Sequence, residues 1–421
     1  MKIKQISLIL FLSLFTSVFL IAATSFAAGK LLYSRDLIYE GAFRVPRGTF
    51  GCTNADYCSF NYGGTALAYN PPGNSLFMVG HDWHQEVAEI SIPKVVNSAN
   101  IKALHTAKVL QPFADITEGH MKNIEAGGGV YPYAVKLGGL MVYNNRLIGT
   151  VYSYYDGGKA VLSHFTSGLK LTAPGSFRGM YKLSNAPTAS FVSGYMTLIP
   201  QEWRAAFGGK ALTGNAAIPI ISRTSLGPSA FVFNPDDLGK INPVPSTPVV
   251  YYPIKHPTLG AWKSDSQYYN GTAEIKGIVF PKGSGSVLFF GRKGTGAFCY
   301  GAGTNDQSLD GKIVPGTGHV AYCYDPARHS KGTHGYPYKY QVWAYDAKDL
   351  VAVKNGKELP WAVKPYAIWN LDLPFAPGNN IISGAAYDPA TQRIFISQFR
   401  GDGGLPVIHV FHVVLGKSGQ V

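Results

Sequence analysis

One pattern recurs along this chain and constrains its fold more than any other feature. An apolar strand, a tight turn, a second apolar strand, a polar loop and a third strand follow one another in five places. A unit of this kind buries its faces only against neighbouring units, so its repetition predicts a ring of small sheets, the β-propeller. The five copies contain the segments GGTALAYNPPGNSLFMVG, GGLMVYNNRLIGTVYS, AAIPIIS, IKGIVFPKGSGSVLFFG and SGAAYDPATQRIFISQ.

The ends of the second strands give the spacing of the repeat. Successive steps are 73, 69, 69 and 107 residues, measured between Gly80, Ser153, Ser222, Gly291 and Gln398. We interpret the long last step as one insertion, at about residues 292–339, between the second and third strands of the fourth copy. A single helical pattern, at 200–209, precedes the second strand of the third copy, so Trp203 and Arg204 are expected to be structural or partner-facing, not catalytic.

Each propeller blade also needs a fourth, outer strand. The fifth copy reaches the C-terminus without one, so we expect residues 36–46 to complete its sheet and remove an exposed edge. The prediction is an all-β chain with one propeller over residues 28–421, built of five four-stranded blades. A β-sandwich, two small all-β domains, or six or seven blades are the alternatives. The other outer strands are expected at 107–113, 176–183, 248–254 and 366–375.

The N-terminus and the cysteines predict an exported protein, secreted or periplasmic. Residues 1–27 combine Lys2 and Lys4, an apolar run and small residues before a cleavage point, the pattern of a signal peptide. That run is short for a membrane span, and no later segment has 18 consecutive apolar residues, so no transmembrane segment is expected. Two sequence-local pairs, Cys52 with Cys58 and Cys299 with Cys323, predict disulfides. A zinc site of all four thiolates is the alternative.

The charge balance favours acidic partners. The chain has 37 Lys and Arg against 24 Asp and Glu, a formal net charge of +13. This excess attracts anions, but it is scattered and forms no basic block, so a nucleic-acid partner is not favoured. The oligomeric state is not indicated.

Function in a propeller concentrates where loops meet on one face. The loops from second to third strands and the loops between blades share this face, here called the top face. The candidate catalytic residues there are His81, Asp82, His84, Glu125, Tyr155 and Glu274. The candidate substrate-binding residues are Trp83, Tyr154, Arg223, Arg292, Lys293, Arg400 and Asp402. Further acid, base or ligand candidates are Asp56, Glu118, His120, Tyr131 and Asp265.

Each candidate also has a structural interpretation. Loop cations are often only solvated, His81 or Asp82 can stabilise a turn, and tyrosines often pack. The argument for binding is collective, because three successive copies place Arg223, Arg292 and Arg400 at the same loop position. Guanidinium groups recognise carboxylate, sulfate or phosphate through paired hydrogen bonds, so an anionic ligand is predicted.

No cofactor is predicted, with one alternative. His81, His84 and Glu125 form a set of two imidazoles and one carboxylate that suits a zinc ion. The insertion, closed by its disulfide and carrying His319, His329 and His334, is interpreted as a lid over the top face.

At the level of architecture the chain resembles secreted carbohydrate-active five-bladed propellers, which include glycosidases and lectins. Such glycosidases typically carry carboxylates at the axial start of early inner strands, where this chain has Asn61-Tyr62-Gly63-Gly64. Propeller polysaccharide lyases are similar in residue types. No motif aligns their residues with this chain, and we ourselves assign the arginines to a sugar carboxylate and proton transfer to His81, His84 or Tyr155. Together with the arginines, the resemblance leads to the hypothesis of an exported protein that binds an anionic polysaccharide in its top-face cleft, with cleavage by a lyase or hydrolase mechanism as the further hypothesis. A non-catalytic lectin-like or protein-binding propeller at the cell surface is the alternative.

Overall fold

A computed structural model describes residues 29–54, 56–124, 135–153, 160–215, 224–253, 255–256, 259–263 and 266–416. The predicted signal peptide lies outside these residues. Within them the chain is predominantly β, as predicted, with only short helices. No helix in the described part is long and apolar enough to cross a membrane.

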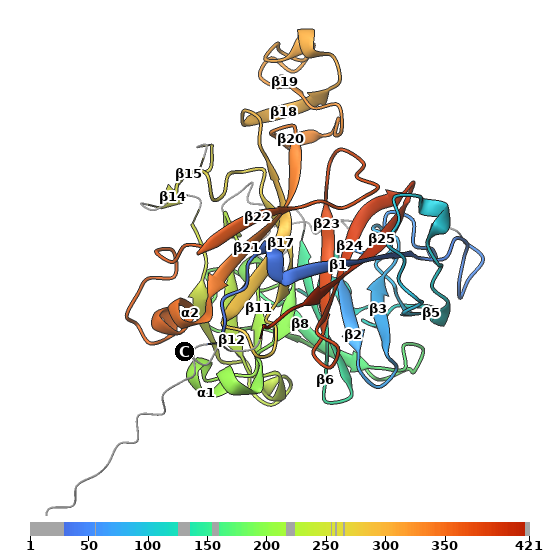
Figure 1. Cartoon of the computed structure of the whole chain (residues 1–421), viewed down its shortest axis with the longest axis vertical. Coiled ribbons are helices and arrows are strands. Elements are labelled where there is room, and N and C mark those ends of the chain that lie inside the picture. The colour runs from blue at the N-terminus through green and yellow to red at the C-terminus, as the bar shows by residue number, and fades with distance from the viewer. Residues whose placement is uncertain are drawn as a thin grey trace, which may run out of the picture.

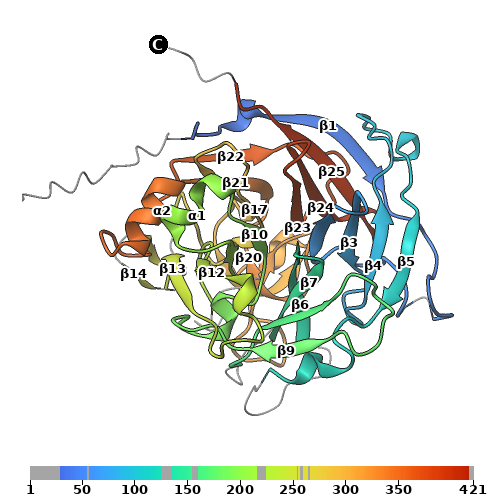
Figure 2. The ribbon, with the colours of Figure 1, turned by 90° about the horizontal axis from the view of Figure 1, so that it is seen from below.

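The described residues form five four-stranded antiparallel sheets arranged around a common centre (Figure 2). The first is β2 (Leu67–Asn70), β3 (Ser75–Val79), β4 (Val87–Ser91) and β5 (Val109–Ala114). The second is β6 (Val135–Tyr143), β7 (Arg146–Ser153), β8 (His164–Gly168) and β9 (Arg178–Tyr181). The third is β10 (Met196–Leu198), β11 (Ala211–Thr213), β12 (Ala230–Phe233) and β13 (Ser246–Val250). The fourth is β16 (Glu274–Val279), β17 (Ser286–Gly294), β21 (Tyr338–Asp346) and β22 (Ala367–Leu371). The fifth is β23 (Ile382–Asp388), β24 (Arg393–Asp402), β25 (Leu405–Val413) and β1 (Leu37–Arg44).

The last sheet joins the two ends of the chain, as predicted. Strand β1 pairs antiparallel with β25, from Leu37 opposite Val413 to Arg44 opposite Val407. Buried Asp402 accepts a hydrogen bond from Arg44 Nε at 2.9 Å and one from Arg47 Nη2 at 2.8 Å. Asp402 therefore anchors the closing strand, while its role in substrate binding stays a prediction.

The repeat prediction fails at one strand. The predicted second strand of the third copy, 216–222, lies outside the described residues, and β11 occupies that place in the sheet. Pro219 explains the error, since proline cannot donate to a central ladder. The predicted outer strands agree with β5, β9, β13 and β22.

The predicted helical segment lies between β10 and β11, at the bottom of the molecule in Figure 1. A short 3-10 helix (Gln201–Trp203) continues into α1 (Arg204–Phe207), which ends at Gly208 in the left-handed conformation. The indole of buried Trp203 donates to the Ser284 carbonyl at 2.8 Å, tying this segment to the fourth sheet. The structural interpretation of Trp203 agrees with this contact.

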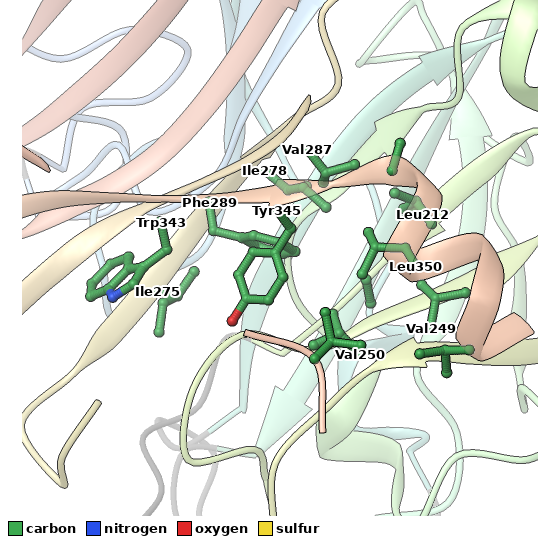
Figure 3. Packing of buried hydrophobic residues seen from close by; sticks show 14 of the residues in the cluster. Leu212, Val249, Val250, Ile275, Ile278, Val287, Phe289, Trp343, Tyr345 and Leu350 are labelled. Atoms are coloured by element: carbon green, nitrogen blue, oxygen red, sulfur yellow. The ribbon is translucent and has the colours of Figure 1, made fainter. Parts of the chain in front are cut away.

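Aromatic side chains fill the wedge between the third and fourth sheets (Figure 3). Trp343, Tyr345 and Phe289 are fully buried there, beside α2 (Ala347–Lys354). The hydroxyl of Tyr345 lies 2.6 Å from that of Tyr252 and 2.7 Å from that of Tyr269, so these buried polar groups keep hydrogen-bond partners.

The inner strands approach one another at glycines. A methyl group on Gly138 would lie 1.9 Å from the Ser193 carbonyl oxygen, and one on Gly277 would lie 2.5 Å from the Ala385 Cβ. Both distances are far inside van der Waals contact, so only glycine permits this tight ring.

The insertion forms a small sheet of its own between β17 and β21. Strand β18 (Cys299–Thr304) pairs with β19 (Ala321–Tyr324) and β20 (Lys331–His334). Figure 1 shows it rising from the face opposite α1, and Figure 2 places β20 near the centre of the ring. A two-stranded ribbon, β14 (Lys255–His256) and β15 (Gly260–Ala261), lies between β13 and β16. Both predicted disulfides are present, Cys52–Cys58 and Cys299–Cys323.

Candidate active site on the top face

A cavity of about 130 Å³ opens among the starts of the inner strands, on the side away from α1. We call it the axial pocket. Three of the five sheets contribute to it, so segments distant in sequence meet as the ring prediction requires. Its lining residues are Thr65, Asp82, Glu274, Lys276, Ile381, Ser383 and Phe399.

β-Bulges aim side chains into this pocket. The pairing of β16 with β17 skips Lys276, and the pairing of β23 with β24 skips Ser383. In the first sheet Gly64 and Ala66 both bond to Val79, which leaves Thr65 in the equivalent place. A bulged residue leaves the hydrogen-bond ladder, and its side chain changes direction. The same irregularity in three sheets therefore turns the Lys276 ammonium group and the Thr65 and Ser383 hydroxyls towards the propeller axis.

Glu274 is a permanently ionised carboxylate in this pocket. Its Oε1 accepts from Arg292 Nη2 at 2.7 Å and from Arg328 Nη1, in the insertion, at 3.4 Å. Burial raises the pKa of Glu274, but the charges of Arg292, Arg328 and Lys276 outweigh burial and hold the pKa at about 2. Glu274 can accept a hydrogen bond or a proton but cannot serve as a proton donor near neutral pH.

Arg292 is not available to a ligand. Its side chain is 1% exposed, it donates to the Asn379 carbonyl at 2.5 Å, and it lies 4.3 Å over the Tyr338 ring. The charge of Arg292 is instead paired with that of Glu274 inside the protein.

Two lysines bring positive charge to the axial pocket, where the sequence predicted arginines. Lys136 forms an ion pair with Asp82. Lys276 Nζ lies 3.5 Å from the Tyr152 hydroxyl and over the Tyr152 ring. Two carboxylates, Asp82 and Glu274, thus face four cations, namely Lys136, Lys276, Arg292 and Arg328, so the pocket carries a net positive charge.

An exposed group of aromatic rings adjoins the axial pocket. We call Tyr57, Tyr62 and Trp83 the aromatic platform; Trp83 is 71% exposed and the two tyrosines are each 46% exposed. His84 lies against Tyr57, His81 contacts Tyr62 and Trp83 edge-on, and the Arg400 guanidinium lies 5.7 Å from the Tyr62 ring. Asp82 and Phe399 line the axial pocket and directly precede Trp83 and Arg400 in the chain, so the platform lies beside the pocket along the sequence.

The two histidines are neutral near pH 7. Burial is the main cause that lowers the pKa of both His81 and His84. His81 Nδ1 accepts from the Trp83 backbone N–H at 3.2 Å, which leaves the proton of the neutral ring on Nε2. His81 is therefore a hydrogen-bond donor, and His84 is the better candidate for a base. The zinc set involves Glu125, which lies outside the described residues.

Several predicted residues lie elsewhere. Glu118 accepts three backbone N–H bonds from residues 175–177, and His120 stacks on Phe177, so both organise the edge of the second sheet. Lys293 donates to the Ser266 carbonyl at 2.5 Å.

The histidines of the insertion lie in different surroundings. His334 is buried, and its Nδ1 lies 2.7 Å from the Asp325 carboxylate, whereas His319 and His329 are exposed. Tyr131, Tyr154, Tyr155, Arg223 and Asp265 lie outside the described residues.

The sequence contained a signal for the residues that were missed. Thr65, Lys276 and Ser383 each precede a small residue at the start of an inner strand, in Thr-Ala-Leu, Lys-Gly-Ile and Ser-Gly-Ala. The repeat aligns these positions, which lie at strand starts and not in the loops. The insertion does contribute Arg328 to the site, while its movement as a lid stays a prediction.

No family model and no curated protein matches the sequence. Solved structures that resemble it include a glycosyl hydrolase from Bacteroides ovatus, with 11% identity, 92% of this chain and 94% of that chain covered, and a TM-score of 0.40. A putative glycoside hydrolase from Bacteroides ovatus has 13% identity, coverage of 91% and 98%, and a TM-score of 0.44. A GH43 endo-arabinanase from Bacillus licheniformis has 12% identity, coverage of 87% and 95%, and a TM-score of 0.37. At such low similarity no role is transferred from these structures to this chain.

Proposed function

We propose that this protein is exported and binds an acidic polysaccharide on its top face. The observation that carries the proposal is an exposed aromatic platform beside a small, positively charged axial pocket. Aromatic rings cover the apolar faces of sugars, and ammonium groups recognise carboxylates. A uronate unit at the pocket places its carboxylate at Lys276 and its hydroxyls near Thr65 and Ser383, while neighbouring units lie on Trp83.

We further propose cleavage by elimination in preference to hydrolysis. Hydrolysis requires a carboxylic acid that is protonated near neutral pH. Glu274 is held ionised, so its environment does not favour that role. In elimination, a base such as His84 removes the proton beside the sugar carboxylate, the bond to the 4-oxygen breaks, and that oxygen takes up a proton.

Binding without cleavage is the second candidate. It is favoured by the ion pairs of Asp82 and Glu274, which occupy both carboxylates of the pocket. The two candidates share the ligand and differ only in turnover.

The mature chain should be tested for binding to polyuronates and to neutral arabinans and mannans by calorimetry. Unsaturated sugar ends are followed by ultraviolet absorbance and new reducing ends by a chemical assay. Lys276→Ala should weaken polyuronate binding about tenfold or more, because a charge-assisted hydrogen bond is lost. Trp83→Ala should weaken binding to every glycan that uses the platform.

Lys282→Ala is the matched control, because it removes an ammonium group on the opposite face of the propeller. Equal affinity of the Lys276 and Lys282 variants for polyuronate would contradict the anion proposal. Binding with no unsaturated ends and no reducing sugar would favour the non-catalytic candidate.

A further inference from the structure

A second cavity, of about 320 Å³, lies on the face opposite the axial pocket. It is enclosed by the far ends of all five inner strands, and we call it the basal cavity. One wall residue from each strand is Leu67, Leu140, Met196, Ile278 and Ala385. It is distinct from the axial pocket, with which it shares no lining residue.

The wall of the basal cavity is apolar. Leucine, isoleucine, methionine and alanine side chains dominate, and Ile199, Ile278 and Phe280 at its base are 0–1% exposed. Alanines at 68, 385 and 386 leave the centre open where larger side chains would fill it. Water in such a hollow finds few polar partners, so the wall favours an apolar occupant.

The rim of the cavity is basic. Lys282 is exposed, and Arg204 is half-buried and held in place by its Nε bond to the Ile199 carbonyl at 3.0 Å and its Nη1 bond to Gln201 at 2.7 Å. Two carboxylates lie near this rim: Glu202 accepts the Gly283 N–H at 2.7 Å, and buried Asp388 interacts with the Tyr69 hydroxyl. Neither Arg204 nor Lys282 forms an ion pair with any residue that the structure describes, so the rim presents cations to solvent.

We propose that the basal cavity binds a medium-chain fatty acid, with the alkyl chain along the propeller axis and the carboxylate at Arg204 and Lys282. The volume is near the lower end of the roughly 300–1,000 Å³ typical of small-molecule sites, which favours a medium over a long chain. Met141 and Met196 adapt to a flexible chain better than branched side chains do. The proposal is independent of the glycan function of the top face.

The test is calorimetric titration of the mature chain with hexanoate, octanoate, decanoate and dodecanoate below their micellar concentrations. Each added methylene should tighten binding about fourfold until the cavity is full, after which affinity should level off. Decanol should bind about tenfold more weakly than decanoate, because it lacks the carboxylate. Lys282→Ala should reduce this difference in affinity between decanoate and decanol.

Two variants make the test specific. Val142→Trp places a large ring in the cavity wall and should abolish decanoate binding while the unfolding midpoint stays near that of the wild type. Lys276→Ala, on the top face, should leave decanoate binding unchanged. Lack of saturable binding of any of the four acids would overturn the proposal. So would equal binding by the wild type, the Val142 variant and the Lys282 variant.

Discussion

Arg292 and Arg400 end equivalent second strands, yet they lie in opposite environments. Arg292 is buried and paired with Glu274, whereas Arg400 is exposed and contacts the ring of Tyr62. Both are arginines near the end of a second strand, but Arg292 follows Gly291 by one residue, whereas Arg400 follows the equivalent Gln398 by two. A sequence pattern therefore identifies cations near the site without telling which of them a ligand can reach.

At the residue scale, Arg292→Ala should destabilise the fold by about 3–5 kcal/mol, because buried Glu274 loses its short ion pair and keeps only the longer contact with Arg328 at 3.4 Å. The measurement is the free energy of unfolding from denaturant titration. Arg400→Ala is the matched control and should change it by no more than about 0.5 kcal/mol. Equal effects of the two substitutions would show that the Arg292–Glu274 pair is not an essential part of the core.

Glu274 should also make stability depend on pH. Its pKa is lowered from 4.5 to about 2 in the folded chain, so its stabilising contribution is complete above about pH 4.5 and is lost as the pH falls towards 2. The difference in free energy of unfolding between the wild type and Glu274→Gln should therefore become smaller as the pH falls from about 4.5 towards 2. Denaturant titrations at a series of pH values measure this difference, and a constant difference would contradict the assigned pKa.

At the element scale, the inner strands combine two backbone features. Bulges direct Lys276 and Ser383 into the axial pocket, and the glycine after each of them permits close contact with the next strand. The repeated Lys-Gly and Ser-Gly pairs in the sequence thus encode both the site and the packing of the ring. Gly138-Gly139 repeats the same geometry in the second sheet.

Gly138→Ala should destabilise the protein by about 1–3 kcal/mol, because the new methyl group meets the Ser193 carbonyl and the strands must separate. Gly332→Ala is the control, since the nearest atom to its added methyl group is a side-chain nitrogen at an ordinary 3.5 Å. Thermal unfolding of the two variants gives the comparison. A Gly138 variant as stable as the Gly332 variant would mean that the ring tolerates expansion.

At the scale of the whole molecule, the ring depends on a strand from one chain end completing a sheet from the other. Removing residues 29–47 from the mature chain would expose the edge of β25 and leave Asp402 without Arg44 and Arg47. We expect this truncated chain to lose cooperative unfolding and to aggregate, because an uncovered strand edge pairs with other chains. Size-exclusion chromatography and thermal unfolding measure both effects. A monomeric truncated chain with one sharp transition would show that ring closure is dispensable.

The sequence by itself determined the repeat, the outer strands, the closing strand and the two disulfides, since apolar periodicity and turn residues are local properties. It also selected Asp82, Glu274 and Trp83 for the top face, where the structure places them. Tertiary structure decided which charges cancel one another, because burial and pairing join residues far apart in the chain, such as Glu274 with Arg328. It also produced the basal cavity, which is a space between five strands and belongs to none of them.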